Sequence, residues 1–216
     1  MASPRVAHYE IQPFTPVEAR SFLAAIKGDR LEALYSVALT MGLRQGEALG
    51  LEWQDVDLKL GYLRISKQLQ RNDGKFELVE PKTARSRRTL ALPASIVLSL
   101  RDHRLRQADE LRVSGRQPQR WDLVFTTDRG QPIDGTVVSH HFHRVLERTG
   151  LPQRRFHDLR HSCATLLLVQ GVSPRVVMDV LGHSQIAMTM NTYSHVIPEL
   201  KRDAAQRMEE LIADRD

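Results

Sequence analysis

Residues 60–92 differ in pattern from the rest of this 216-residue chain. Short apolar runs at Tyr62–Ile65, Phe76–Val79 and Thr89–Leu92 predict three strands, and Asn72–Gly74 is a typical hairpin turn. On both sides of this stretch, apolar residues recur at helical spacing in segments that end at glycines. The sequence therefore predicts a mixed α/β fold, mainly α-helical, with one small three-stranded antiparallel sheet.

The expected helices begin at capping signals. Thr15–Glu18 reads as a capping box with proline at the first helical position, and Gly28 ends that helix. We expect residues 1–12 to be a tether and residues 13–216 to form a single domain. The expected helices cover residues 16–28, 31–41, 45–51, 93–113, 136–149, 157–170, 174–182, 185–193 and 198–213.

Composition narrows the class of protein. Cys163 is the only cysteine, so no internal disulfide can form, and a reducing compartment, the cytoplasm, is expected. Cys163 lies on the apolar side of its predicted helix, where burial is its expected role. No apolar run approaches the ~20 residues of a membrane span, so no membrane association is expected.

The distribution of charge is more informative than its total. A net charge of +5 and a pI of about 9.6 are weak evidence for a nucleic-acid partner. Between Pro81 and Arg106, however, there are seven Lys or Arg residues and one acid, whereas residues 199–216 carry six acids and four bases. This pattern favours a localised polyanion-binding surface, with a solvated charged face as the alternative.

Histidines and an arginine near the end of the chain indicate a phosphate site. His157, Arg160 and His161 share one face at the N-terminal end of a predicted helix, where backbone N–H groups also attract anions. His183 lies 23 residues after Arg160, and Tyr193 follows ten residues later. With Arg44 far upstream as a second arginine, histidines from two separate segments and a phenol suit phosphoryl transfer to the tyrosine.

Two further residues complete this chemistry. Arg44 sits just past a helix stop, where its guanidinium can project into a cleft and hold two phosphate oxygens. A phenol of pKa ~10 attacks at pH 7 only if a base takes its proton and the phosphate charge is neutralised. The leaving oxygen needs a proton, which Lys82 could donate; the alternative for Lys82 is a plain DNA-backbone contact.

These residues lie in blocks that together resemble a known family, the catalytic domain of the tyrosine recombinases or phage integrases. The resemblance covers nearly the whole chain from about Pro13. The blocks are Gly42–Glu47 with Leu49 and Leu51, Lys82–Thr83 with Arg87–Arg88, His157–Thr165, Leu181–Ser184 and Thr192–His195.

The resemblance implies a DNA breaking-rejoining enzyme that forms a 3′-phosphotyrosine link at Tyr193 and needs no metal, nucleotide or other cofactor. Lys82 would be the general acid toward the 5′ oxygen, and His157 would serve in proton transfer. Arg44, Arg160 and His183 would bind the non-bridging oxygens, Glu47 and His161 would support the site, and Arg85, Arg87 and Arg88 would contact DNA.

The resemblance also implies partners. The substrate would be double-stranded DNA, and the protein would be a monomer alone and a homotetramer on paired DNA sites. The helix at 198–213 would dock onto a neighbouring subunit; packing on its own domain is the alternative. Full-length family members carry one or two DNA-binding domains before this one, so an excised catalytic domain is expected here.

Two other functions are compatible with the same residues. One is DNA relaxation by a type IB topoisomerase, although the compact blocks at 157–168 and 181–184 fit the integrases better. The other is a DNA-binding fragment that is inactive through truncation. A zinc site at His140, His141 and His143 is not expected, because no cysteine pairs accompany them.

Overall fold

The computed structural model describes residues 12–81, 83–115 and 121–183, together with positions 202, 205, 206, 208–210 and 212. The helices agree with the expected ones to within a few residues at their ends. The expected helix at 185–193 lies outside the described residues, whereas the described positions between 202 and 212 are helical. The helices are α1 (Pro16–Ala25), α2 (Glu32–Met41), α3 (Gln45–Leu49), α4 (Ala94–Ser114), α5 (Gly135–Thr149), α6 (His157–Val169) and α7 (Pro174–Leu181), with short 3₁₀ turns at Trp53–Asp55 and Ala84–Ser86.

Local signals account for the helix ends. The Thr15 N–H donates to Glu18 Oε2 at 2.8 Å and the Glu18 N–H donates to Thr15 Oγ1 at 3.2 Å, which confirms the capping box of α1. Gly42, Gly150 and Gly182 end α2, α5 and α7 in the left-handed conformation that glycine adopts without strain. The chain therefore reverses direction at defined points.

The strands form a three-stranded antiparallel sheet and a separate hairpin. The sheet has the order β1 (Val56–Asp57), β2 (Tyr62–Ile65), β5 (Arg88–Ala91), with Leu63 opposite Leu90. Among the described residues, β3 (Gln68–Asn72) and β4 (Lys75–Val79) pair only with each other, so the prediction that Phe76–Val79 joins the sheet is wrong.

Packing on α3 explains why the hairpin stands apart. β3 lies across α3, where Gly50 admits its backbone: a Cβ at Gly50 would lie 2.5 Å from the Leu69 nitrogen. The turn residues Asp73 and Gly74 both have positive φ, 47° and 79°, as a tight two-residue hairpin requires. The hairpin is thus held locally by its turn and laterally by α3.

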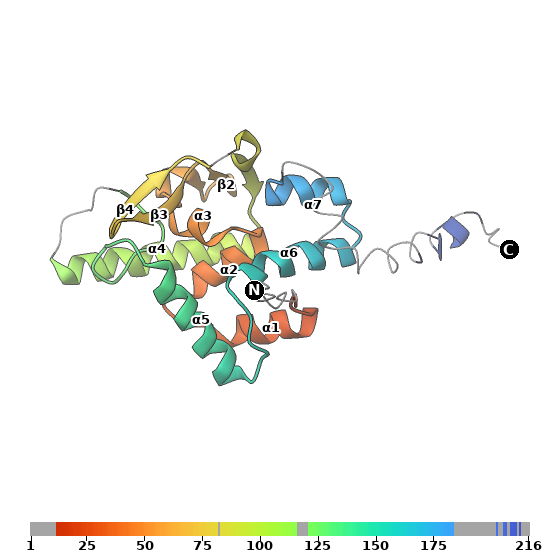
Figure 1. Cartoon of the computed structure of the whole chain (residues 1–216), viewed down its shortest axis with the longest axis horizontal. Helices are drawn as coiled ribbons and strands as arrows, with labels where there is room; N and C mark the ends of the chain where they lie inside the picture. Colours follow the sequence, from red (N-terminus) through yellow and green to blue (C-terminus); the bar gives the residue numbers. More distant parts are fainter. Residues whose placement is uncertain are drawn as a thin grey trace, which may run out of the picture.

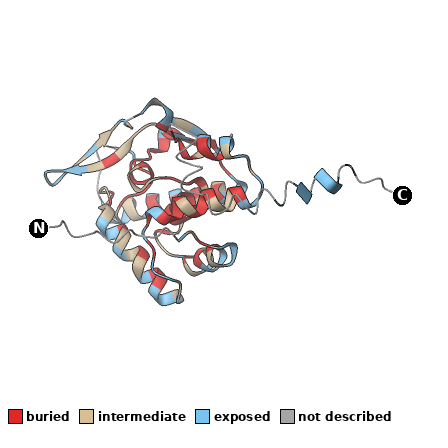
Figure 2. Ribbon diagram, turned by 45° about the vertical axis from the view of Figure 1, so that its right-hand side comes forward, coloured by how far each residue is buried: buried red, intermediate tan, exposed pale blue. Residues whose placement is uncertain are grey.

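The helix α2 forms the centre of the molecule. Eight of its ten residues are buried, and it packs against α4 and α6. Figure 1 shows the strands on one side of α2 and α4, and α1 and α5 on the other. In Figure 2 the buried residues gather along these central helices, while the outer end of the β3–β4 hairpin is exposed. The core thereby fixes Gly42, the residue that follows α2.

No helix in the described part of the chain is both long and apolar enough to cross a membrane. Cys163 is buried in α6, as expected, and its thiol donates to the carbonyl oxygen of Thr40 at 3.3 Å. Burial raises the pKa of this thiol to about 12, so it stays protonated and packs as a small apolar side chain.

Candidate active site

Arg44 is positioned by the start of α3. It is the N-cap residue of this helix, directly after the turn at Gly42. Its backbone N–H donates to Glu47 Oε2 at 3.0 Å, and its Nη1 donates to Glu47 Oε1 at 2.8 Å. The Glu47 side chain is 2% exposed and that of Arg44 is 34% exposed. A buried carboxylate therefore holds a guanidinium that reaches the surface.

Arg160 links its own helix, α6, to the end of α2 and to the end of α7. Its side chain is among the largest that are fully buried. Its Nη1 donates to the carbonyl oxygen of Gly42 at 2.7 Å and its Nη2 donates to that of Leu181 at 2.6 Å. These two bonds bring the turn before Arg44 and the end of α7 onto the same guanidinium.

His157 and His161 lie one helical turn apart on α6. Their rings meet edge to face with centroids 4.9 Å apart. His157 is the first residue of the helix and its side chain is exposed, whereas His161 is half-buried. The two histidines therefore share the face expected from their spacing, whereas the side chain of Arg160, expected on the same face, is turned into the protein.

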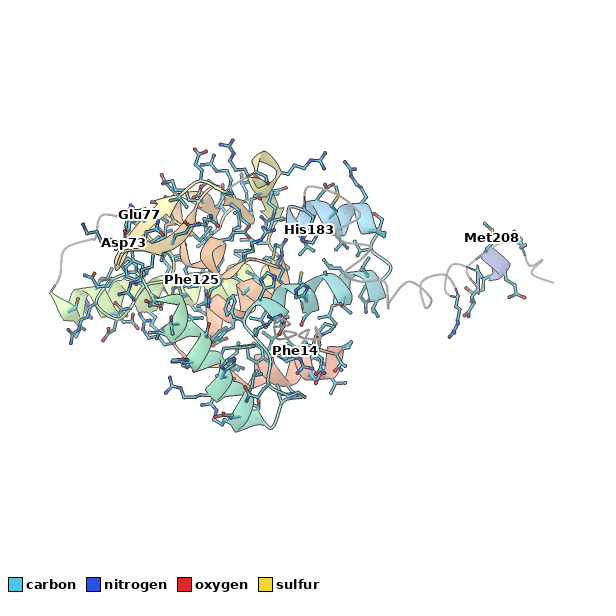
Figure 3. The ribbon with its side chains drawn as sticks, in the orientation of Figure 1. Phe14, Asp73, Glu77, Phe125, His183 and Met208 are labelled. Atoms are coloured by element: carbon cyan, nitrogen blue, oxygen red, sulfur yellow. The ribbon has the colours of Figure 1, made fainter. Side chains whose placement is uncertain are left out.

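His183 follows directly on the glycine that ends α7. Its N–H donates to the carbonyl oxygen of Met178 at 3.0 Å, which closes the last turn. Gly182 has a φ of +67°, and a Cβ there would lie 3.1 Å from the Arg85 carbonyl oxygen. The turn therefore packs closely against the loop before β5. His183 itself is 9% exposed, and Figure 3 places it between α7 and α6.

The imidazoles of the site are held neutral. Burial, followed by the positive charges of Arg160 and Arg44, lowers the pKa of His183 to about 4. Burial and the neighbouring His157 lower the pKa of His161 to about 4. Partial desolvation and the same two guanidinium charges lower the pKa of His157. A neutral imidazole can both donate and accept a proton, so each ring is competent for hydrogen bonding to a phosphate at pH 7.

Glu47 stays ionised in this surrounding. Burial opposes its charge, but hydrogen bonds and the charge of Arg88 outweigh burial and leave the pKa of Glu47 below its ordinary value. Arg88 donates to both of its oxygens, from Nη2 to Oε2 at 2.9 Å and from Nη1 to Oε1 at 3.2 Å. The carboxylate thus bridges Arg44 and Arg88. The sequence does not reveal the contact with Arg88, because Arg85, Arg87 and Arg88 are the same residue type within four positions.

Most of the expected site residues converge. Lys82 and Tyr193 lie outside the described residues. Of the three arginines expected to contact DNA, Arg87 has a side chain that is 54% exposed and Arg85 is also exposed, whereas the Arg88 side chain is only 6% exposed. The residues that the described structure brings together are Arg44, Glu47, His157, Arg160, His161 and His183.

A cleft of about 560 Å³ adjoins the site through Arg88. Arg64, Lys67 and Arg87 line it together with the acidic residues Asp55 and Glu80. Arg87 and Arg88 of this cleft belong to the basic stretch between Pro81 and Arg106, whereas Arg64 and Lys67 precede that stretch in sequence. Within the described ranges, no three His, Cys, Asp or Glu side chains gather in a way that could hold a metal ion.

Known proteins share this chain's sequence pattern. The chain matches the phage integrase family over residues 13–199. A tyrosine recombinase XerC-like protein of Caldanaerobacter subterraneus is 37% identical over 214 residues, which cover 94% of this chain and 55% of the relative. The ICEBs1 integrase of Bacillus subtilis is 28% identical over 199 residues, covering 91% of this chain and 54% of the relative.

Solved structures share the fold. The Tn1549 transposon integrase in complex with transposon right end DNA superimposes with a TM-score of 0.79 at 26% identity, over 98% of this chain and 69% of that chain. The XerA recombinase gives a TM-score of 0.69 at 21% identity, over 96% of this chain and 67% of that chain, a likeness of fold alone.

The chain therefore belongs to the phage integrase family, and its fold is the tyrosine-recombinase catalytic fold that the sequence motifs predict. It spans about half the length of the curated relatives described above. Their names are those of integrases and recombinases and give the topoisomerase interpretation no support.

Proposed function

We propose that this chain is the catalytic part of a site-specific DNA recombinase that cuts and rejoins strands through a 3′-phosphotyrosine intermediate. The observation that carries the proposal is the convergence of Arg44, Arg160 and His183 from three separate segments. Two guanidinium groups and a neutral imidazole can donate to the oxygens of one phosphate and stabilise the charge that develops on them during attack. Family membership supports the same chemistry.

In the proposed reaction the phenol of Tyr193 attacks the scissile phosphorus. The bond from its oxygen to phosphorus forms while the bond from phosphorus to the 5′ oxygen breaks. His157, at the exposed start of α6, accepts the phenolic proton, and the Lys82 ammonium gives a proton to the departing 5′ oxygen. Rejoining is the reverse reaction, with a 5′-hydroxyl attacking the phosphotyrosine. The covalent link conserves the energy of the broken strand, so no nucleotide is consumed.

The proposed substrate is double-stranded DNA. Arg85 and Arg87 are exposed on the loop that follows Lys82, and the adjoining cleft carries further basic side chains. Such side chains neutralise backbone phosphates without reading bases, so affinity should fall steeply with salt. The structure of the Tn1549 integrase was solved in complex with transposon right end DNA, which supports the same class of partner for this chain.

For the assembly we propose a tetramer on paired DNA sites, in which the C-terminal helix docks onto a neighbour. Met208 and Ile212, two apolar residues of the segment expected to form this helix, are 58% and 71% exposed. Deleting residues 199–216 should leave a folded protein that assembles poorly on paired DNA sites. The mass of the assembly would be measured by native mass spectrometry or light scattering. A truncated protein that unfolds, or that assembles as well as the parent, would contradict docking in trans.

Strand exchange tests the proposed function against its alternatives. DNA sites would first be recovered by selecting covalent adducts from nicked duplexes of randomised sequence. Two differently labelled copies of the recovered site would then be incubated with the chain, without metal or nucleotide. A recombinase yields products that join the two labels. Relaxation of a supercoiled plasmid without joined products would indicate a topoisomerase, and binding without adduct would indicate an inactive fragment.

A further inference from the structure

Arg88, the first residue of β5, is enclosed by the residues around it. Its side chain is 6% exposed, whereas that of its neighbour Arg87 is 54% exposed. Arg88 therefore lies in a sequence that reads as a DNA-contacting loop, yet its guanidinium is turned into the protein. A buried guanidinium persists only when its donors find acceptors, so the partners of Arg88 define what it does.

Those partners lie on three different segments. Nη1 and Nη2 donate to the two oxygens of Glu47 on α3 at 3.2 and 2.9 Å. Nε donates to the carbonyl oxygen of Val180 on α7 at 2.6 Å, and Nη1 also donates to that of Ser86 at 3.0 Å. The planar fork of one side chain thus joins α3, the end of α7 and the loop that follows Lys82.

The neighbours of this fork are the residues that we place in the chemistry. Glu47 orients Arg44 through two hydrogen bonds. Val180 is three residues before His183. Gly182, which lies between them, packs closely against Arg88, because a Cβ at Gly182 would be 3.0 Å from Arg88 Nη1. A displacement of the Arg88 guanidinium would consequently be transmitted to both phosphate-binding groups at once.

We propose that Arg88 is a positioning residue, which sets the separation between Arg44 and His183 through Glu47 and the last turn of α7. This inference rests on the proposed function. Lysine cannot replace Arg88, because one ammonium cannot reproduce a planar fork that donates to acceptors on three segments. Errors near 1 Å in the placement of catalytic groups cost on the order of 10²-fold in rate, which sets the expected effect.

The test compares Arg88→Met with Arg112→Met, which removes an arginine from an exposed ion pair on α4. Cleavage of a nicked duplex would be measured in single turnovers at saturating protein, and affinity would be measured separately over a salt series. Arg88→Met should cleave about 10²-fold more slowly with an affinity within twofold of the parent. Arg112→Met should resemble the parent in both. Cleavage by Arg88→Met at the parent rate, or a defect confined to salt-dependent affinity, would overturn the proposal.

Arg88→Lys separates positioning from folding. It retains the charge and much of the volume, so it should fold even if Arg88→Met does not, and it should still cleave about 10²-fold more slowly at saturation. Full cleavage by Arg88→Lys would show that charge alone suffices and would contradict the proposal.

A measurement on DNA-free protein keeps this inference apart from the proposed function. The imidazole NMR signals of His183 should move in Arg88→Lys and stay in place in Arg112→Met, whether or not the parent cleaves DNA. Unmoved signals would refute the link between Arg88 and His183. If the signals move but the parent forms no covalent adduct, the proposed function fails and the positioning of His183 by Arg88 stands.

Discussion

Arg160 Nη1 donates to the carbonyl oxygen of Gly42 at 2.7 Å, although 118 residues separate the two in sequence. The same guanidinium reaches the carbonyl oxygen of Leu181 at 2.6 Å. Both acceptors lie at helix ends, and the chain continues from them to Arg44 and to His183. The buried Arg160 side chain therefore links the two turns that precede the other phosphate donors.

Replacing Arg160 should damage both chemistry and stability. Arg160→Ala removes a preorganised donor, which typically costs 10²–10³-fold in rate, and leaves two buried carbonyls without it at ~1–3 kcal/mol each. Arg160→Lys should also be poor, because an ammonium cannot serve two divergent carbonyls and a phosphate together. Single-turnover cleavage at a temperature where both variants are folded checks this, and rates within a few-fold of the parent would contradict the assigned role.

Gly42 should tolerate no side chain. Its φ is +63°, and a Cβ would lie 2.6 Å from Leu181 Cδ2 and 3.2 Å from Cys163 Sγ. Gly28 is the matched control, because its φ is +79° but no atom of the described residues lies within 4 Å of its added Cβ. In both alanine variants the strained backbone should lower the free energy of unfolding by ~1–2 kcal/mol. Overpacking should lower it by a further ~1–3 kcal/mol in Gly42→Ala. Urea unfolding measures the difference; equal losses would show that α7 yields easily.

The buried histidines should make the fold sensitive to acid. The pKa of His161 and that of His183 are lowered to about 4, below the ordinary value of 6.5. Between pH 6.5 and 4 the unfolded chain binds more protons than the folded one, so stability falls as pH falls through this window and is flat above it. His183→Asn should weaken this dependence in thermal unfolding between pH 7 and pH 5. An unchanged slope, relative to the parent and to a change at exposed His140, would contradict burial of His183 as its cause.

Lys82 can be assigned by chemistry. A substrate with sulfur in place of the bridging 5′ oxygen has a leaving group that departs without a proton. Lys82→Ala should therefore cleave the ordinary substrate slowly and the sulfur substrate nearly as fast as the parent does. A variant that binds normally but stays inactive on the sulfur substrate would rule out Lys82 as the acid. A defect only in salt-dependent affinity would make it a backbone contact.

The sequence predicts the helix boundaries, because local capping and turn residues determine them. The capping box at Thr15 and the glycines after α2, α5 and α7 carry their own signals, so the helices were found close to their observed ends. The sequence does not predict which strands pair, because strand pairing depends on contacts between residues that are distant in sequence. β1 has only two residues, and the polar strand β3 has no apolar alternation to reveal it.

In the site, too, local spacing is predictable from the sequence, whereas contacts between distant segments are not. The spacing of His157 and His161 on one helix predicts that their side chains lie close together, whereas the inward turn of Arg160 does not follow from it. The inward turn of Arg88 could not be predicted, because Arg85 and Arg87 present the same side chain in the same loop. Only the acceptors on α3 and α7, which are distant in sequence, distinguish Arg88 from its neighbours.

Trapping the covalent intermediate shows whether Tyr193 becomes joined to DNA. On duplexes nicked close to the cleavage site, the short 5′-hydroxyl fragment diffuses away, so any phosphotyrosine link persists and survives denaturation. The parent chain should yield an adduct whose DNA-bearing peptide contains Tyr193. Tyr193→Phe, which removes one oxygen and little volume, should bind the duplex equally well and yield none. An adduct on another residue, an adduct formed by Tyr193→Phe, or a parent that binds the nicked duplexes of randomised sequence but forms an adduct with none of them would contradict this mechanism.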